Sequence, residues 1–342
     1  MDENIKSSLK KSLVNYENNQ KSIHWNNFLK EKFINLQIKD LYNFRNNNLS
    51  DGMDNVHFNK VNNELRLNQF NEYLLKNNET IEEYYKYFPK KNIGNCPNQI
   101  KTKGGYIDYI FIESLMFYIE LKKYVFNNNK INNICEIGGG FGSLARIVML
   151  DQKIKYFIID LPEAITLSTF FLNQNFPNKK ILTYDNVKND NLFADDIANY
   201  DIIMIPPWVN FENIKIDLFI NTRSMMEMKF SIIENYFRFI QKNISNKGYF
   251  FNCNRYYKDT VGHPIKLHEY PYDKFWKIIS SEPTWSQRRL HTLITKRVSG
   301  ETDEIEKEML KIKILSKNHT PHFLQTFKIS NVIKKFFKLE NV

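Results

Sequence analysis

The feature that most constrains this fold is the glycine-rich stretch at residues 134–146. A short apolar run containing Glu136 is followed by Gly138, Gly140 and Gly142, and then by an apolar pattern with a helical period. A buried strand that leads through a glycine turn into a helix is typical of a doubly wound α/β domain, where the turn holds a cofactor. The stretch therefore predicts a Rossmann-like α/β fold.

The rest of the chain alternates between strand-like and helix-like patterns. We expect strands at 133–137, 155–160, 200–205, 216–220, 248–253 and 290–296, and helices at 104–126, 143–150, 162–177, 231–243 and 273–280. The 200–205 run is preferred to 181–184 as the third strand because its apolar run is longer. This alternation predicts a mostly parallel sheet with helices on both faces.

The two ends of the chain have a different character. Residues 1–95 are polar, rich in Asn and helical in pattern, and residues 301–342 are basic and amphipathic. We therefore divide the chain into a helical N-terminal extension (1–95), a cofactor domain (96–300) and a helical tail (301–342). The extension is either a cap over a substrate site, an arm for a homo-oligomer, or a cover for the core.

Charge and cysteine content limit the partners and the compartment. The chain carries 48 basic and 38 acidic residues, a net charge of +10, which suits acidic partners such as nucleic acid, anionic lipids or sugar phosphates. Lys and Asn are spread along the whole chain, so the charge indicates compositional bias, and no nucleic-acid partner is expected. The three cysteines form no paired or CxxC pattern, which predicts a reducing compartment and no metal site.

Hydropathy gives no sign of a membrane protein. No apolar run approaches the roughly 20 residues that a transmembrane helix needs, and the acidic, polar start lacks a signal core. We therefore expect a soluble, cytoplasmic protein without a transmembrane segment.

The spacing of the glycines bears on the identity of the cofactor. A dinucleotide loop needs G-x-G-x-x-G, but the sixth position here is Ser143, and Glu136 precedes the first glycine. A carboxylate at this point would repel a pyrophosphate, which favours a bare helix N-terminus. S-adenosylmethionine has no phosphate and carries a sulfonium and an α-amino cation. We therefore expect Glu136, Gly138, Gly140 and Gly142 to hold S-adenosylmethionine.

A second acidic residue supports this cofactor. Asp160 ends the next predicted strand. In dinucleotide-binding folds an acidic residue about 20 positions on accepts hydrogen bonds from the ribose. Asp160 is therefore expected to bind the ribose hydroxyls of the same cofactor.

With these residues in view, the sequence resembles class I S-adenosylmethionine-dependent methyltransferases. More narrowly it is similar to the sugar O-methyltransferase family of polysaccharide-biosynthesis loci, through residues 135–146, 157–163, 219–228 and 250–256. The similarity covers roughly residues 100–297. It implies an enzyme that methylates a sugar hydroxyl, on a sugar or glycan intermediate of surface polysaccharide or glycoconjugate biosynthesis.

Acceptor chemistry is expected after the 216–220 strand, because ligands of open α/β sheets bind outside the carboxyl ends of strands. Asn221 at the strand tip is expected to bind the methionine part of the cofactor or the acceptor. Glu227 is either the base that activates the acceptor hydroxyl or a carboxylate placed at a helix N-terminus by the dipole. Arg223 either grips an acidic group of the acceptor or forms a structural ion pair.

The loop after the 248–253 strand supplies further candidates. Arg255 has the same two interpretations as Arg223, and Tyr256 is expected to bind the acceptor. His263 and His268 are each a candidate base, because histidine titrates near neutral pH, or an ordinary surface residue.

Two other functions stay open. The net charge is compatible with a methyltransferase of RNA or of another small molecule, and the fold with a non-catalytic methyltransferase-like subunit of a glycan-assembly complex. Pro206-Pro207-Trp208 follows Ile205, where an N-methyltransferase of adenine or glutamine would carry Asn or Asp, which argues against N-methylation. The intact glycine loop with its two acidic residues argues against a non-catalytic subunit.

Overall fold

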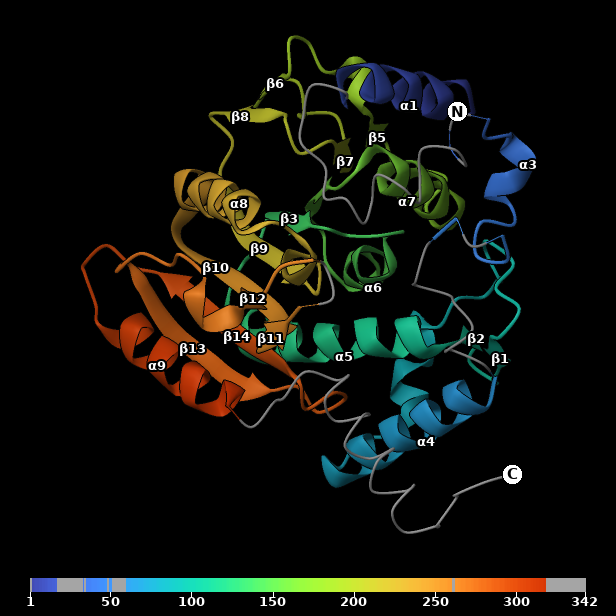
Figure 1. Cartoon of the computed structure of the whole chain (residues 1–342). Helices are drawn as coiled ribbons and strands as arrows, with labels where there is room; N and C mark the ends of the chain where they lie inside the picture. The colour runs from blue at the N-terminus through green and yellow to red at the C-terminus, as the bar shows by residue number, and fades with distance from the viewer. Residues whose placement is uncertain are drawn as a thin grey trace, which may run out of the picture.

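The computed structural model describes residues 2–16, 33, 35–47, 49–50, 60–259 and 262–317. Its centre is an eight-stranded sheet with the order β13-β14-β10-β9-β3-β4-β7-β5 (Figure 1). The strands are β3 (Asn133–Ile137), β4 (Lys155–Ile159), β5 (Ile181–Leu182), β7 (Ile202–Ile205), β9 (Ile216–Thr222), β10 (Ile244–Arg255), β13 (Trp276–Pro283) and β14 (Leu290–Arg297).

Neighbouring strands from β5 to β10 are parallel, and β14 runs antiparallel between β10 and β13. Parallel strands covered on both faces need continuous apolar runs, and all four residues of β7 are buried. The order confirms the Rossmann-like expectation. It also confirms the preference for the third strand, because β7 lies directly beside β4 and β5 lies outside it.

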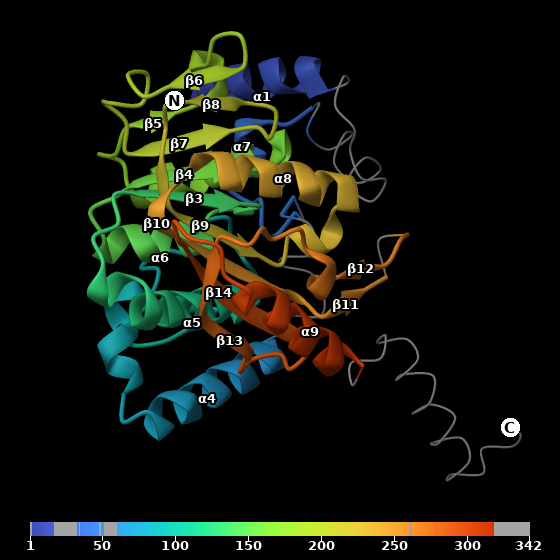
Figure 2. The same ribbon diagram turned by 90° about the vertical axis from the view of Figure 1, so that its left-hand side faces the viewer.

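Helices cover both faces of the sheet. Helices α5 (Tyr109–Tyr124), α6 (Ser143–Asp151) and α7 (Pro162–Asn175) share one apolar cluster with one face. Helix α8 (Phe230–Asn243) and helix α9 (Glu304–Ser316) share the second cluster with the opposite face. Helix α9 packs against β13, as Figure 2 shows. Because both faces of the sheet are buried under helices, the apolar periodicity along the chain switches between the strand and the helix pattern.

One predicted element is wrong. Residues 273–280 were expected to be helical, but residues from Trp276 onward form β13, which pairs with β14 along its length. Trp276 is fully buried beside Phe250 and Tyr272. Pairing with β14 and burial of this side chain override the local helical pattern.

The N-terminal extension packs closely on the α/β part of the chain. Its helices are α1 (Asp2–Tyr16), α3 (Ile38–Leu41) and α4 (Lys60–Lys76), and α1 lies on α7. Arg45 forms a buried ion pair with Asp108, the N-cap of α5, at 2.9 Å. Phe44 contacts Phe141 of the glycine loop, with ring centroids 5.6 Å apart. The extension thus supports the glycine loop. Residues 17–32, 51–59 and 318–342, which carry part of the predicted extension and tail, lie outside the described residues.

Short elements complete the described chain. They are the strands β1 (Ile100–Lys101), β2 (Tyr106–Ile107), β6 (Asn191–Phe193), β8 (Asn210–Glu212), β11 (Tyr257–Lys258) and β12 (Ile265–Lys266), and the 3-10 helices η1 (Ile81–Tyr87), η2 (Phe126–Asn128), η3 (Tyr184–Asn186), η4 (Met225–Glu227) and η5 (Leu267–Glu269). Within the described ranges, no helix has the length and apolarity required to span a membrane.

Candidate functional site

The chain changes direction across the sheet between β3 and β9. From β3 it continues through α6 to β4 on one side, and from β9 through α8 to β10 on the other. Such a switch point opens a crevice at the carboxyl ends of the strands, where α/β proteins bind ligands. The glycine loop after β3 and residues 221–227 after β9 both lie at this edge.

The two loops are in direct contact at Gly138. Its φ of +76° is left-handed, and a Cβ built there would lie 2.1 Å from the Ser224 hydroxyl oxygen. Ser224 in turn donates to the carbonyl of Ile137 at 3.0 Å. Only glycine fits this position, because any side chain would push the two loops apart. Gly140 and Gly142 also have positive φ, and Gly142 is the N-cap of α6.

Asp160 follows β4 and holds the glycine loop from the other side. Its carboxylate accepts hydrogen bonds from the backbone N–H groups of Gly140, at 2.8 Å, and Leu161, at 2.7 Å. Burial nevertheless raises the pKa of Asp160 to about 7, against the lowering effect of these two bonds. Each oxygen keeps a second lone pair, which is the capacity needed to accept from ligand hydroxyls.

Glu136 lies beneath the glycine loop. Its side chain is 2% exposed and accepts a hydrogen bond from the Tyr156 hydroxyl at 2.8 Å. Burial raises the pKa of Glu136 to about 7, opposed by the Tyr156 bond and reinforced by the charge of Asp160. A carboxylate buried in this way influences the charges around it through its field.

The carboxylates of Glu136 and Asp160 suit a ligand that carries a positive charge and hydroxyl groups that can donate hydrogen bonds. No lysine or arginine forms an ion pair with Glu136 or Asp160 in the described part of the chain. Two neighbouring carboxyls with raised pKa values and no protein cation gain from a positively charged ligand. The described residues contain no group of three or more His, Cys, Asp or Glu that could hold a metal ion.

Asn221 has a structural role in this edge. Its amide nitrogen donates to the Ile137 carbonyl, at 2.8 Å, and to the Ser224 hydroxyl, while its oxygen accepts from Asn254, at 2.8 Å. The oxygen also accepts from the backbone of Met225, and the side chain is fully buried. All its hydrogen-bonding capacity is used inside the protein, so Asn221 positions the loops and has no group left for the cofactor.

Glu227 lies between the tips of β3 and β4, which carry Glu136 and Asp160, and the end of β10, which carries Arg255. Burial is the main cause that raises the pKa of Asp160, and the charge of Glu227 adds to it; burial lowers the pKa of Arg255, and the charge of Glu227 opposes that shift. The carboxylate is 29% exposed and its Oε1 forms an ion pair with Lys258 at 2.5 Å. Lys258 is 8% exposed, and burial lowers its pKa. Among the described residues, the side chain of Glu227 makes this ion pair and no other hydrogen bond.

The two candidate histidines lie in different parts of the structure. His263 contacts the carbonyl of Met228 at 3.1 Å and thus stays near Glu227. His268 lies near α9, where Lys313 contributes to a pKa that burial lowers, and no residue of the glycine loop contacts it. The structure brings His263 to the site and leaves His268 outside it.

The remaining acceptor candidates also separate. Arg223 has a left-handed φ of +65° at the tip of β9, and its backbone N–H donates to Cys253 at 2.7 Å. Arg255 ends the neighbouring strand, β10. Tyr256 is fully buried, and its hydroxyl bonds to His291 at 2.8 Å on the opposite face. Tyr256 therefore does not face an acceptor, because strand alternation turns it away from Arg255.

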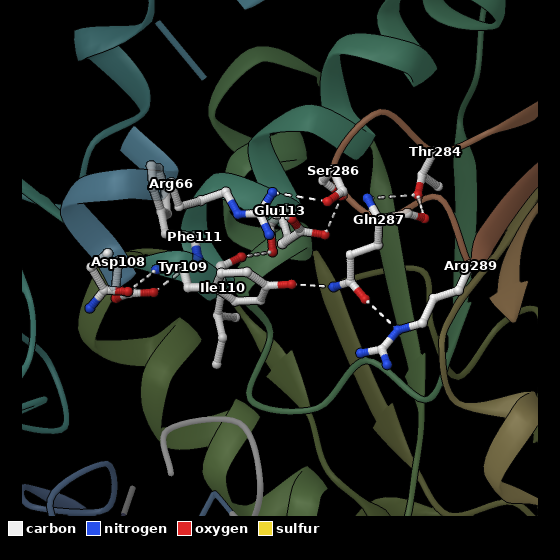
Figure 3. A network of polar contacts seen from close by, with 12 residues as sticks. Arg66, Asp108, Tyr109, Ile110, Phe111, Glu113, Thr284, Ser286, Gln287 and Arg289 are labelled. Carbon is white, nitrogen blue, oxygen red and sulfur yellow. Dashed lines mark hydrogen bonds and ion pairs between the residues drawn. The ribbon is translucent and has the colours of Figure 1, made fainter. Parts of the chain in front are cut away.

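Several residues at this edge had no signal in the sequence. Lys258, Gln287 and Arg289 come from hairpins far along the chain, and Tyr109 begins α5. Figure 3 shows Tyr109, Gln287 and Arg289 in one line of contacts. Their spacing in the sequence has no pattern, so only the folded chain brings them together.

Comparison with known proteins gives fold-level similarity. No family model and no curated protein matches this chain. The mitomycin 7-O-methyltransferase MmcR matches 55% of this chain and 54% of its own, at 12% identity and a TM-score of 0.37. The S-adenosylmethionine-dependent methyltransferase SibL matches 54% and 55%, at 9% identity and 0.37. A SAM-dependent methyltransferase from Aquifex aeolicus matches 53% and 89%, at 11% identity and 0.32.

The matched part thus spans about half the length of the first two of these proteins. Similarity at this level does not identify a cofactor or a substrate.

Proposed function

We propose that this protein is an S-adenosylmethionine-dependent O-methyltransferase that acts on a sugar hydroxyl, in surface polysaccharide or glycoconjugate biosynthesis. The observation that carries the proposal is the switch-point edge where Asp160 and the buried Glu136 flank the glycine loop, and where neither carboxylate forms an ion pair with a lysine or arginine of the described residues. The sugar acceptor rests on the resemblance of residues 219–228 and 250–256 described above.

The residues around the loop have separate roles in this proposal. S-adenosylmethionine, when bound, would supply a methyl group on its sulfonium. A nucleophile attacks this methyl carbon in line with the sulfur, and S-adenosylhomocysteine leaves. Asp160 accepts hydrogen bonds from the ribose hydroxyls, and Glu136 stabilises the cationic end through its field. Gly138, Gly140 and Gly142 let the backbone approach the ligand closely.

Glu227 activates the acceptor. Its Oε2 takes the proton of the acceptor hydroxyl. Lys258 fixes Oε1 and so holds the carboxylate between the cofactor loop and the end of β10. Glu227→Gln is expected to lower kcat by about 100-fold or more and to leave the affinity for S-adenosylhomocysteine within about twofold. An unchanged kcat with any accepted sugar would assign the base elsewhere, with His263 the next candidate.

Calorimetric titration with S-adenosylhomocysteine tests the cofactor. The wild-type protein should bind it, and Asp160→Ala should weaken binding by about tenfold or more, which corresponds to about 1.4 kcal/mol. Asp195→Ala, on an exposed loop, is the matched control and should bind as the wild type does. Absence of heat and of a thermal shift with the wild type would reject the proposed cofactor.

A further inference from the structure

Three arginines from three separate segments meet on the acceptor side of the edge. Arg223 directly follows β9 and Arg255 ends the adjacent strand β10, and the backbone N–H of Arg223 donates to the Cys253 carbonyl at 2.7 Å. Arg289 precedes β14, and its carbonyl accepts from the backbone of Tyr256 at 3.2 Å. The tips of three neighbouring strands therefore present a guanidinium each.

These arginines have no acidic partners of their own. No carboxylate of the described residues forms an ion pair with Arg223, Arg255 or Arg289. The Nε of Arg255 is buried and has no hydrogen-bond partner. Burial, then the charges of Arg289 and Arg223, lower the pKa of Arg255 to about 10, opposed by the charge of Glu227. Unpaired like charges repel each other, so this arrangement is costly until an anion binds.

The turn that carries Arg289 is held in place by a polar network (Figure 3). Ser286 donates to Glu113 of α5 at 2.8 Å, and its carbonyl accepts from Arg66 of α4 at 3.0 Å. Gln287 donates to the Tyr109 hydroxyl and accepts from the Nε of Arg289 at 3.3 Å. The network fixes the turn to α4 and α5, and so directs Arg289 toward the start of α5.

The geometry points to a phosphate subsite formed by Arg223, Arg255 and Arg289, so that the acceptor is a phosphorylated sugar. This inference rests on the proposed function and narrows its acceptor. Three planar guanidinium forks match the several oxygens of a phosphate, where a single carboxylate needs only one fork. The phosphate belongs either to a sugar 1-phosphate or to a nucleoside diphosphate sugar, and Glu227 lies on the side of the cluster that faces the cofactor loop.

Binding to the folded full-length protein tests the subsite directly. Calorimetry at low salt, with and without S-adenosylhomocysteine, would use pyrophosphate as the probe. Arg255→Gln and Arg289→Gln should each weaken pyrophosphate binding by about tenfold or more, as expected for the loss of a charge-assisted hydrogen bond. Arg289 is exposed, so its variant folds even if Arg255→Gln is unstable. Arg238→Gln, an exposed arginine on α8, is the charge-matched control and should bind as the wild type does.

Two comparisons complete the test. Glucose 1-phosphate or UDP-glucose should bind at least about tenfold more tightly than methyl glucoside, and the tighter of the two identifies the source of the phosphate. Equal binding of methyl glucoside, or pyrophosphate binding that Arg255→Gln and Arg289→Gln both leave unchanged, would overturn the inference. A protein that binds S-adenosylhomocysteine and no phosphate loses only this subsite, whereas a protein that binds phosphate alone loses the proposed cofactor.

Discussion

The two halves of the crevice edge have opposite chemistry. The tips of β3 and β4 present the carboxyls of Glu136 and Asp160 around a glycine loop, whereas the tips of β9, β10 and β14 present arginines. Among the described residues, no lysine or arginine forms an ion pair with Glu136 or Asp160, and no carboxylate forms one with Arg223, Arg255 or Arg289. Under the proposed function, opposite fields side by side would orient a cationic donor and an anionic acceptor toward their common border, where Glu227 lies.

The halves also differ in how they are built. The carboxyl half is held by backbone hydrogen bonds and by the contact of Gly138 with Ser224. The basic half is held by side chains from α4, α5 and the turn before β14. We therefore expect substitutions that alter the backbone to affect the carboxyl half most. Substitutions that remove a charge should weaken ligand binding in one half and leave it unchanged in the other.

The largest effect is expected for Gly138→Ala. The left-handed φ costs a non-glycine residue about 1–2 kcal/mol, and the new Cβ collides with Ser224, which adds about 1–3 kcal/mol. Thermal unfolding should show the lower stability, and calorimetry should show S-adenosylhomocysteine affinity reduced by about 100-fold or more. Gly300→Ala, which meets open space, should behave like the wild type. Full affinity in Gly138→Ala would mean that the two loops need not touch.

The next effect concerns pH. The folded-state pKa of Glu136 is raised to about 7 from an ordinary 4.5, so the folded protein binds a proton that the unfolded chain has released. The stability of the ligand-free protein should fall as pH rises from about 4.5 to 7 and then level off. Glu136→Gln should reduce this fall by on the order of 1–3 kcal/mol, measured by denaturant unfolding across the range.

Glu120 on α5 provides the control, since burial raises its pKa to about 7 as well. Glu120→Gln should flatten the stability profile and leave the pH dependence of S-adenosylmethionine binding intact. Glu136→Gln should flatten both, because only an ionised Glu136 favours the cationic ligand. An unaltered binding profile in Glu136→Gln would remove its assigned electrostatic role.

A crossed pair of variants separates the halves. Asp160→Ala should lose about tenfold in S-adenosylhomocysteine affinity and keep pyrophosphate affinity within about twofold, and Arg289→Gln should do the reverse. Calorimetry with the two ligands on the two variants gives the four values required. A loss of both affinities in either variant would show that the halves are one coupled site.

The smallest effect is expected for Tyr256→Phe. Removal of its hydroxyl breaks the buried bond to His291 and should cost about 1 kcal/mol of stability. Because Tyr256 faces away from the arginines, both ligand affinities should stay as in the wild type. A weaker pyrophosphate affinity in this variant would restore Tyr256 to the acceptor site.

The sequence predicted those parts of the fold that local patterns control. The strand at 133–137 and the helices after Gly142 and Leu161 lie where the apolar periodicity and the turn residues place them. It mistook residues 276–280 for a helix, because their pairing partner, β14, lies further along the chain. The sequence also could not predict the direction in which a side chain points, as Asn221 and Tyr256 show.

The sequence by itself therefore determined the glycine loop, since Glu136, three glycines and Asp160 lie in a βαβ unit whose geometry is local. Only the tertiary structure decided the arginine-bearing side of the edge. Arg223, Arg255 and Arg289 come from strand tips that become neighbours when β14 inserts beside β10, and Lys258 reaches Glu227 from a separate hairpin. The physical reason is that a loop closed by backbone turns is encoded by adjacent residues, whereas a charge cluster depends on long-range strand order.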